Sequence, residues 1–375
     1  LTNIMNYEIK VFSELNSELR ECWRILEKES YNYCFQSFEW FENWINNYRS
    51  DNVDYSLRIV IVSLQSKVLC ILPFEIEKKS SLKILKWAGG EQADYCSPIL
   101  SKDFNLDKKS FKYLWQKIIN SIPGIDIIYL KNQPRNIEEV ENPFVLFLKN
   151  YRDSSTYNIL LPETWEEYTD KIIKKNFLSQ NYRKEKQLKK VGNLEFKIAT
   201  TDHDKIKFME ELIIQKNARL FSQGIKDSFK PKDLNFYKEF ENKNLKNLKT
   251  HISSLVLNNE LIAVHWGVVY NNRFYYLVLS MKEGNLDRYS PGRLLISSLI
   301  RWAIKEKIKI FDFTLGDEDY KKSWSNNTGS LFNHIQVNTL NGFLLFLLIK
   351  IKLILKSFSK KNYLKKIILT IKKIF

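Results

Sequence analysis

The alternation of hydrophobic and polar positions predicts the same order of elements twice along the chain. In each half, three strand-like runs are followed by a helical segment and then by one further strand. The first half has these runs at 56–64, 68–77 and 82–89, then a helix over 107–120 and a strand over 125–130. The second half has them at 251–259, 260–272 and 273–280, then a helix from Pro291 and a strand over 309–315.

Further segments are expected before each set of strands. The helical spacing of apolar residues predicts helices over 13–30, 35–48, 165–190 and 205–221, and strand patterns lie at 156–162 and 194–200. Together these elements predict the α+β class, with a mixed and mostly antiparallel sheet flanked by helices in each half. A length of 375 residues favours two domains over one. We expect one domain over 1–150, a second over 151–340 and a tail over 341–375.

The two halves differ where their last helix begins. The second half has the stretch RYSPG over 288–292, whereas the equivalent stretch of the first half, 101–110, has neither glycine nor proline. Ser290 is a favourable N-cap because its hydroxyl can accept a backbone N–H, and Pro291 suits the first helical position. Gly292 allows another molecule to approach the backbone. Such a helix start suits a phosphate, and it is also typical of a well-capped surface helix.

Composition and charge narrow the function classes. A hydrophobic content of 44% argues against disorder. The net charge of +16 indicates an anionic partner such as nucleotide phosphates, RNA or an acidic membrane surface, although a bias towards Lys, Ile and Asn produces the same excess without a function.

The cysteines and the hydropathy of the chain indicate the cellular compartment in which the protein is expected. Cys22, Cys34, Cys70 and Cys96 form no CxxC pair and no zinc-like spacing with histidines, so we expect reduced thiols and no metal. The first ten residues lack the pattern of a secretory signal, and no apolar run is long enough for an ordinary spanning helix. We therefore expect a cytoplasmic protein.

Three stretches of the second half resemble the bacterial CelD-like acyltransferase family, a branch of the GNAT superfamily. They are ELIAVHWGVVYNNRFYYLVLS, YSPGRLLISSLIRWA and FDFTLGDEDYKKSW, in this order and spacing. FQSFEWFENW near the start and Arg219 in NARLF also fit, so the resemblance covers roughly residues 35–330 and is strongest over 260–324. The related Fem-type peptidoglycan aminoacyltransferases have twin GNAT-like domains, which agrees with the doubled order of elements.

The resemblance implies that an acyl-CoA donor lies in a wedge where two strands splay. Its thioester carbonyl would meet backbone N–H groups at Leu277, Val278 and Leu279, which are fixed in place before charge develops. Its pyrophosphate would meet the turn before the last helix. The expected donor-binding residues are Leu279, Arg288, Ser290, Pro291, Gly292 and Arg293. Leu294 stands where the superfamily usually has a second small residue, and the Fem-type enzymes, which depart similarly, use aminoacyl-tRNA.

Acyl transfer to an amine also needs a route for the amine's proton. Glu318 lies just past the strand end in LGDEDYKKSW, and Lys321 matches a lysine of the Fem-type enzymes that could neutralise a phosphate or an oxyanion. Asp312 alternates with Phe311 and Phe313, so it faces away from them and suits either catalysis or a structural role. The residues expected to bind the acceptor are Arg219, Asp317 and Tyr320.

His265 lies in AVHWG, on a strand next to the donor strand. An imidazole there could act as a base near neutral pH, but its apolar neighbours favour a hydrogen-bonded core histidine. Tyr275, Tyr276 and Tyr289 are nearby and could protonate a leaving thiolate. In a chain with 19 tyrosines, chance proximity competes with that interpretation.

Two basic segments remain. Residues 165–190 gather eight lysines and arginines on one expected helix, which suits a solvated face or, alternatively, a cradle for a diphosphate or an RNA backbone. Residues 341–375 carry nine lysines and no acid, which predicts helices with one apolar and one basic face. Such a tail suits an anionic membrane surface, and helices packed on the catalytic domain are the alternative.

The sequence therefore predicts a cytoplasmic N-acyltransferase at the inner face of the membrane. We expect an acyl-CoA donor and an amino group on a sugar nucleotide or lipid-linked sugar, in the biosynthesis of surface polysaccharide. The catalytic candidates are Glu318, Lys321, Asp312 and His265. A Fem-type tRNA-dependent aminoacyltransferase and a non-catalytic membrane- or RNA-binding module of the same fold are the alternatives.

Overall fold

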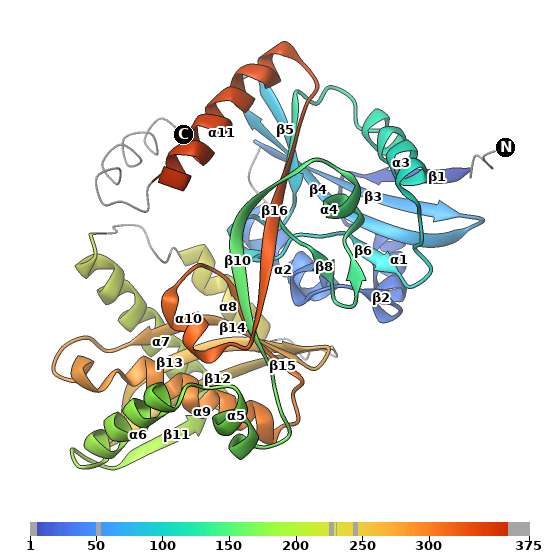
Figure 1. Cartoon of the computed structure of the whole chain (residues 1–375). Coiled ribbons are helices and arrows are strands. Elements are labelled where there is room, and N and C mark those ends of the chain that lie inside the picture. The colour runs from blue at the N-terminus through green and yellow to red at the C-terminus, as the bar shows by residue number, and fades with distance from the viewer. Residues whose placement is uncertain (1–5, 50–53, 225–228, 230, 243–246, 359–375) are drawn as a thin grey trace.

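The computed structural model describes residues 6–49, 54–224, 229, 231–242 and 247–358. Its elements follow the expected order in both halves (Figure 1). The first half contains β1 (Tyr7–Phe12), α1 (Ser17–Lys28), β2 (Ser30–Tyr31), η1 (Cys34–Gln36), α2 (Phe38–Tyr48), β3 (Tyr55–Leu64), β4 (Lys67–Lys79), β5 (Leu82–Trp87), η2 (Gly90–Gln92), β6 (Ile99–Ser101), α3 (Lys108–Asn120), β7 (Ile127–Pro134), β8 (Asn136–Ile137), β9 (Val140–Glu141) and α4 (Pro143–Phe147).

The second half begins with a long strand and ends with a long helix. It contains β10 (Asn150–Leu160), α5 (Trp165–Lys171), α6 (Lys175–Lys189), β11 (Leu194–Ile198), α7 (Asp202–Ser222), α8 (Pro231–Asn242), β12 (Leu248–Leu257), β13 (Glu260–Tyr270), β14 (Arg273–Met281), η3 (Asp287–Tyr289), α9 (Pro291–Lys305), β15 (Ile310–Leu315), α10 (Asp319–Trp324), β16 (Asn327–Val337) and α11 (Leu340–Phe358).

The doubled order of strands is confirmed. In the first half, β3, β4 and β5 are antiparallel neighbours, and β7, after α3, pairs parallel with β5. In the second half, β12, β13 and β14 are antiparallel neighbours, and β15, after α9, pairs parallel with β14. The fold is therefore the expected mixed, mostly antiparallel sheet flanked by helices.

One strand that the sequence did not predict joins the two halves. β16 pairs antiparallel with β7 of the first half and with β10, so that the main sheet runs through both halves in the order β1-β3-β4-β5-β7-β16-β10-β15-β14-β13-β12-β11. Figure 1 shows β10 and β16 side by side, running from one half into the other. β1 and α8 also went unpredicted.

The single helix expected over 165–190 is wrong. The chain forms α5 and α6, separated at Ile172–Lys174. Ile173 is buried in the core that also contains α9 residues, and Lys174 has an extended backbone. Burial of this apolar residue bends the chain, which a periodicity count cannot show.

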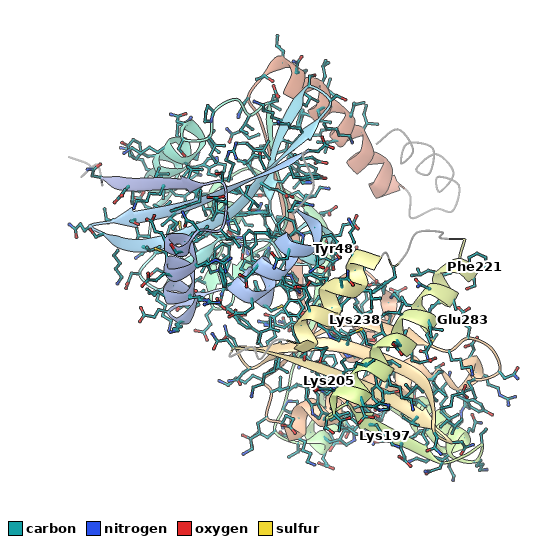
Figure 2. The ribbon with its side chains drawn as sticks, turned by 180° about the vertical axis from the view of Figure 1, so that it is seen from behind. Tyr48, Lys197, Lys205, Phe221, Lys238 and Glu283 are labelled. Atoms are coloured by element: carbon teal, nitrogen blue, oxygen red, sulfur yellow. The ribbon has the colours of Figure 1, made fainter. Side chains whose placement is uncertain are left out.

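Helices cover both faces of the second half's sheet. On one face, Val264 and Trp266 of β13 share a core with Phe208 and Leu212 of α7. On the other face, Ala263 shares a core with residues of α9, because successive residues of a strand point to opposite sides. Figure 2 shows α7 crossing the sheet, with Phe221 at its end near Glu283 in the loop after β14.

Aromatic side chains pack the halves together. The ring of Trp40 in α2 lies 5.2 Å from that of Phe236 and 5.1 Å from that of Phe240, both in α8, and 6.4 Å from that of Trp266. The four cysteines are free, and three of them are buried. A shared aromatic core fixes how the first half sits against the second half's sheet.

A buried ion pair links the same two halves. Arg273 of β14 donates to Asp312 of β15 at 2.8 Å and to Glu138 of the first half at 3.0 Å. The hydroxyl of Tyr95, also from the first half, donates to the other oxygen of Asp312 at 2.8 Å. Asp312 is fully buried, as predicted on the face opposite Phe311 and Phe313. Because every charge here has a partner, the network is tolerated in the core.

Of the tail expected over 341–375, the structure describes α11 as far as Phe358, and residues 359–375 lie outside the described residues. In α11, Leu345 is buried against Ile84, Ile127 and Ile335, while other apolar residues of the helix are exposed. The expected division into one apolar and one basic face stays a prediction, because eight of the nine lysines lie beyond the described side chains. α11 packs on β7 and β16 and so lies against the first half's part of the sheet. In the part of the chain described here, no helix combines the length and apolar character that crossing a membrane requires.

The ion pair gives a stability prediction. We expect Asp312→Asn to lower the free energy of unfolding by about 2–3 kcal/mol, because Arg273 keeps its charge and loses one buried carboxylate. Urea denaturation measures this change. Glu18→Gln, which removes a partner of Lys10 in an exposed pair, is the control and should have no measurable effect. Equal effects of the two substitutions would contradict the structural role of Asp312.

Candidate acyl-transfer site

The donor strand and its neighbour part as expected. β14 and β15 pair over Arg273–Tyr275 and Ile310–Asp312, and beyond these residues the two strands diverge. On its other side, β14 pairs with β13 through a register shift, so that Leu277 bulges between the paired residues Tyr276 and Val278. The end of β14 therefore borders an opening between two strands, at the residues expected to meet a carbonyl group.

A lysine that the sequence analysis did not single out reaches this edge. Lys216 of α7 donates from Nζ to the backbone carbonyl of Leu279 at 3.3 Å. Burial lowers the pKa of Lys216, and the positive charge of Arg219 lowers it further. On this helix the sequence analysis singled out Arg219 alone, and no local pattern distinguished Lys216 from the other lysines of α7.

The turn before α9 lies directly against the donor strand. A Cβ atom at Gly292 would lie 3.1 Å from Cδ2 of Leu279 and 3.2 Å from Sδ of Met281. The backbone N–H groups of Arg293 and Leu294 bond to the carbonyl of Ser290. The helix N-terminus and the end of β14 therefore form one surface, as a bound thioester with a pyrophosphate would require.

Ser290 does not act as the side-chain cap that its residue type suggested. Its backbone is left-handed, with φ of 53°, and its hydroxyl bonds to no N–H of α9. Instead, the hydroxyl accepts a hydrogen bond from Nζ of Lys184 at 2.5 Å. The 3-10 turn η3 leads into this conformation, and the sequence pattern of a cap does not distinguish the two geometries.

Three basic side chains surround the turn. Lys184 comes from α6, and its pKa is lowered by burial and by the charges of Arg293 and Arg183. The guanidinium of Arg293 lies 3.7 Å from the ring centre of Phe177 and donates to its backbone carbonyl. Arg288 stacks over Tyr289. The basic helix thus supplies one cation to the turn, while its Lys189 pairs with Glu185 at the surface.

The loop after β15 is held by several contacts. Lys321 is buried, and its Nζ donates to the carbonyl of Leu315 at 2.6 Å and pairs with the carboxylate of Glu318 at 3.0 Å. The side chain of Glu318 is 56% exposed, so its carboxylate is fixed at one side and open to solvent at the other. Asp317 accepts the backbone N–H of Ser155, which ties the loop to β10.

The structure brings together residues that lie far apart in sequence. Tyr276 has a buried hydroxyl without a hydrogen-bond partner among the described residues. Burial raises its pKa well above the usual value, the nearby Tyr320 and Glu318 raise it further, and the charge of Arg219 opposes them. Burial likewise raises the pKa of Tyr320 to about 12, with Glu318 and Arg219 acting on it in opposite directions. Arg219, Glu318 and Tyr320 thus lie within electrostatic range of Tyr276.

His265 lies in the core rather than at this opening. Its side chain is fully buried, and its ring stacks on Tyr276 at 4.4 Å. Burial holds its pKa well below the ordinary value. Neither ring nitrogen has a hydrogen-bond partner among the described residues, so the expected hydrogen-bonded core histidine is buried without that bond.

The first half also contributes to the site. Burial raises the pKa of Asp94, while a hydrogen bond from Thr314 and the charge of Lys321 lower it. Thr314 itself has a left-handed backbone at the end of β15. Asp94 lies in the loop over 89–100, where its polar side chain between apolar residues was the signal that the sequence analysis passed over.

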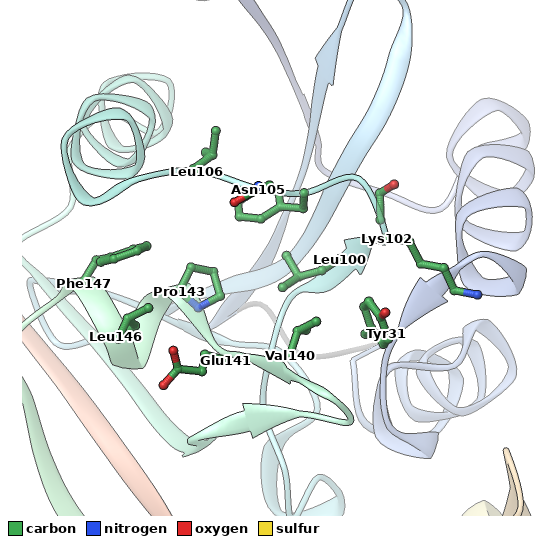
Figure 3. A pocket seen from close by; sticks show the side chains of 12 residues that line it. Tyr31, Leu100, Lys102, Asn105, Leu106, Val140, Glu141, Pro143, Leu146 and Phe147 are labelled. Carbon is green, nitrogen blue, oxygen red and sulfur yellow. The ribbon is translucent and has the colours of Figure 1, made fainter.

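Two other features lie outside this site. A small cavity of about 140 Å³ in the first half is lined by residues that include Tyr31, Leu100, Pro143 and Phe147 (Figure 3). It is too small for a nucleotide-sized ligand. The described residues contain no cluster of three or more His, Cys, Asp and Glu side chains arranged to hold a metal ion.

Known proteins share this fold. Residues 175–322 match the family described as the acetyltransferase (GNAT) domain. FemX is 12% identical, with 91% of this chain and 99% of that chain covered and a TM-score of 0.57. L-PGS from Bacillus licheniformis is 8% identical, with 91% and 98% covered and a TM-score of 0.53. Comparison with curated proteins gives no match.

A third solved structure is also similar. The C-terminal domain (DUF2156) of a putative lysylphosphatidylglycerol synthetase from Agrobacterium fabrum is 9% identical, with 89% of this chain and 96% of that chain covered and a TM-score of 0.52. At these identities, the similarity establishes the fold and leaves the reaction to be argued from the site.

Gly316 provides a test of how tightly the loop after β15 is built. Its φ is 138°, and a Cβ there would clash with Glu318 and lie 2.7 Å from Nζ of Lys321. We expect Gly316→Ala to lower the free energy of unfolding by about 1 kcal/mol more than Gly284→Ala. Gly284 is the control because its φ is 120° and a Cβ there meets no atom within 4 Å. Equal losses in chemical denaturation would show that the Glu318–Lys321 contact adds nothing.

Proposed function

We propose that the protein is an N-acyltransferase that uses acyl-CoA, because residues 175–322 match the acetyltransferase (GNAT) domain family and the fold is similar to that of FemX. The observation that carries the proposal is the opening between β14 and β15, with the N-terminus of α9 at its end. An acyl thioester fits there, with its carbonyl at the backbone of Leu277–Leu279 and its pyrophosphate at Gly292 and Arg293. Lys184 and Arg288 would add positive charge beside the phosphates.

The chemistry follows from the side chains around Tyr276. The acceptor's amine nitrogen attacks the thioester carbon, the amide C–N bond forms and the C–S bond breaks. Glu318, exposed and fixed by Lys321, would accept the proton that the nitrogen loses. Tyr276, whose raised pKa keeps it protonated and whose hydroxyl has no hydrogen-bond partner among the described residues, would give a proton to the leaving thiolate. Lys321 positions the carboxylate, because its own Nζ is buried and bonded.

Other residues named from the sequence take different roles in this proposal. Asp312 fixes the point where the strands part, and His265 supports the ring of Tyr276. Arg219 and Tyr320 border the opening and would bind the acceptor, while Asp317 holds the loop. Asp94 faces the same region from the first half.

The acceptor that we propose is an amino group of a sugar nucleotide or lipid-linked sugar used for surface polysaccharide. Support comes from the family resemblance and from Arg219, which offers a cation beside the reacting amine for an acidic part of the acceptor. One solved neighbour is described as the C-terminal domain of a putative lysylphosphatidylglycerol synthetase. We place the protein in the cytoplasm, at the inner face of the membrane.

A second candidate function is aminoacyl transfer from tRNA. The observation that favours it is the packing of basic helix α6 against the donor turn, where Lys184 contacts Ser290. Cations on α6 would then continue from the turn along an RNA backbone. Binding of charged tRNA, with an affinity that falls steeply as salt rises, together with no binding of coenzyme A, would favour this alternative over the first.

The close contact at Gly292 generates a prediction about the affinity for the donor. We expect Gly292→Val to weaken coenzyme A binding tenfold or more, because the added methyl groups would push against Leu279 and Met281 and cover the helix N-terminus. Calorimetry measures the affinity. Ser298→Val, a similar change two turns along α9, is the control. Unchanged affinity in a folded Gly292→Val protein would place the donor elsewhere.

The Glu318–Lys321 pair generates a prediction about the turnover rate. Glu318→Gln and Lys321→Ala should each lower kcat more than they weaken donor binding, because Glu318 would accept the amine's proton and Lys321 positions its carboxylate. Lys322→Ala, in the same helix and exposed, should leave kcat unchanged. Steady-state kinetics with an amine acceptor measure the effect. Normal kinetics with a lowered melting temperature would reassign the pair to a structural role.

A further inference from the structure

The outer face of α11 is apolar and exposed. Five residues lie on one face of this helix at intervals of three and four, and each is at least 42% exposed: Leu340, Leu344, Leu347, Leu348 and Ile351. Leu340 reaches 86% and Leu344 reaches 63%. A surface helix ordinarily turns polar residues outward, and a continuous exposed apolar patch marks a binding surface. We call these five residues the α11 stripe.

The opposite face of α11 already has its partner. Gly342, Leu345, Phe346 and Ile349 face β7 and β16, and a Cβ at Gly342 would lie 2.1 Å from the carbonyl oxygen of Asp126. The glycine therefore allows the helix to sit directly on the strand end. Because this face is fully used in packing, the stripe is a second apolar face and not a core face left unpacked.

Charge indicates what covers the stripe. No Asp or Glu occurs from 340 to 375, and nine lysines lie in the same segment. The first of them, Lys350, lies beside the stripe, with its Nζ 4.4 Å from the ring centre of Tyr151. An apolar face in a segment that carries only positive charge complements a bilayer with anionic headgroups.

We propose that the α11 stripe inserts into the surface of an anionic lipid bilayer and docks the protein there without crossing it. The helix would lie in the plane of the interface, with the stripe among the acyl chains and Lys350 near the headgroups. The α11 stripe would thus be the surface responsible for the membrane location proposed above. This proposal does not depend on the identity of the acyl donor. A second copy of the chain is the other occupant that the apolar stripe would suit.

The test uses the full chain and vesicles of phosphatidylcholine, alone or mixed with phosphatidylglycerol. We expect sedimentation with the mixed vesicles and little with phosphatidylcholine alone. The double substitution Leu344→Glu and Leu348→Glu should reduce binding to the mixed vesicles at least tenfold, because it places two charges in the stripe. Ile25→Glu is the matched control, since Ile25 of α1 is 59% exposed and lies outside the stripe.

A second measurement tests the proposal even if the double variant fails to fold. An environment-sensitive fluorophore attached at Leu347→Cys should shift to the blue on adding mixed vesicles, and the same label at Ile25→Cys should not. Unchanged binding by a folded double variant, or no shift at position 347, would overturn the proposal. A dimer in sedimentation velocity that the double substitution dissociates, with no vesicle binding, would assign the stripe to a second copy.

Discussion

The buried pair between Arg273 and Asp312 is the constraint on which the site depends. These residues occupy the first and last positions at which β14 and β15 are paired, and beyond them the strands part. Tyr95 and Glu138 of the first half bond to the same two side chains. The opening in the second half's sheet is therefore held from the first half, so that the two halves form one structural unit rather than two modules joined by a linker.

Positively charged and negatively charged groups lie at opposite ends of the proposed site. At the helix end, the N-terminus of α9, Lys184 and Arg293 offer positive charge to phosphates. At the other end, the carboxylate of Glu318 pairs with Lys321 and contributes to the raised pKa of Tyr276, where an amine would react, and burial raises the pKa of Asp94 beside Lys321. This order, with anion binding at one end and proton acceptance at the other, is what joining a phosphate-bearing thioester to an amine requires.

Most of the fold could be predicted from the sequence because hydrophobic periodicity reports which face of an element is buried. The repeated strands, the splayed pair and the turn at Gly292 all followed from local pattern or resemblance. β16 could not be predicted, because its role as a bridge depends on two distant partners, β7 and β10. The burial of His265 could not be predicted either. The sequence pattern showed apolar neighbours for His265 but not its stacking on Tyr276. Asp94 and Lys216 join the site only through tertiary packing, so no spacing rule finds them.

Amide hydrogen exchange of the full chain, with and without coenzyme A, tests most directly that the donor occupies the opening between β14 and β15. We expect slower exchange on binding in two peptides, one covering 276–281 and one covering 288–294, because the ligand would cover backbone N–H groups in both. The α11 peptide should exchange at the same rate in both samples. Protection confined to other regions would contradict the placement of the donor between β14 and β15. The same conclusion would follow if saturating coenzyme A left exchange at 276–281 and 288–294 unchanged.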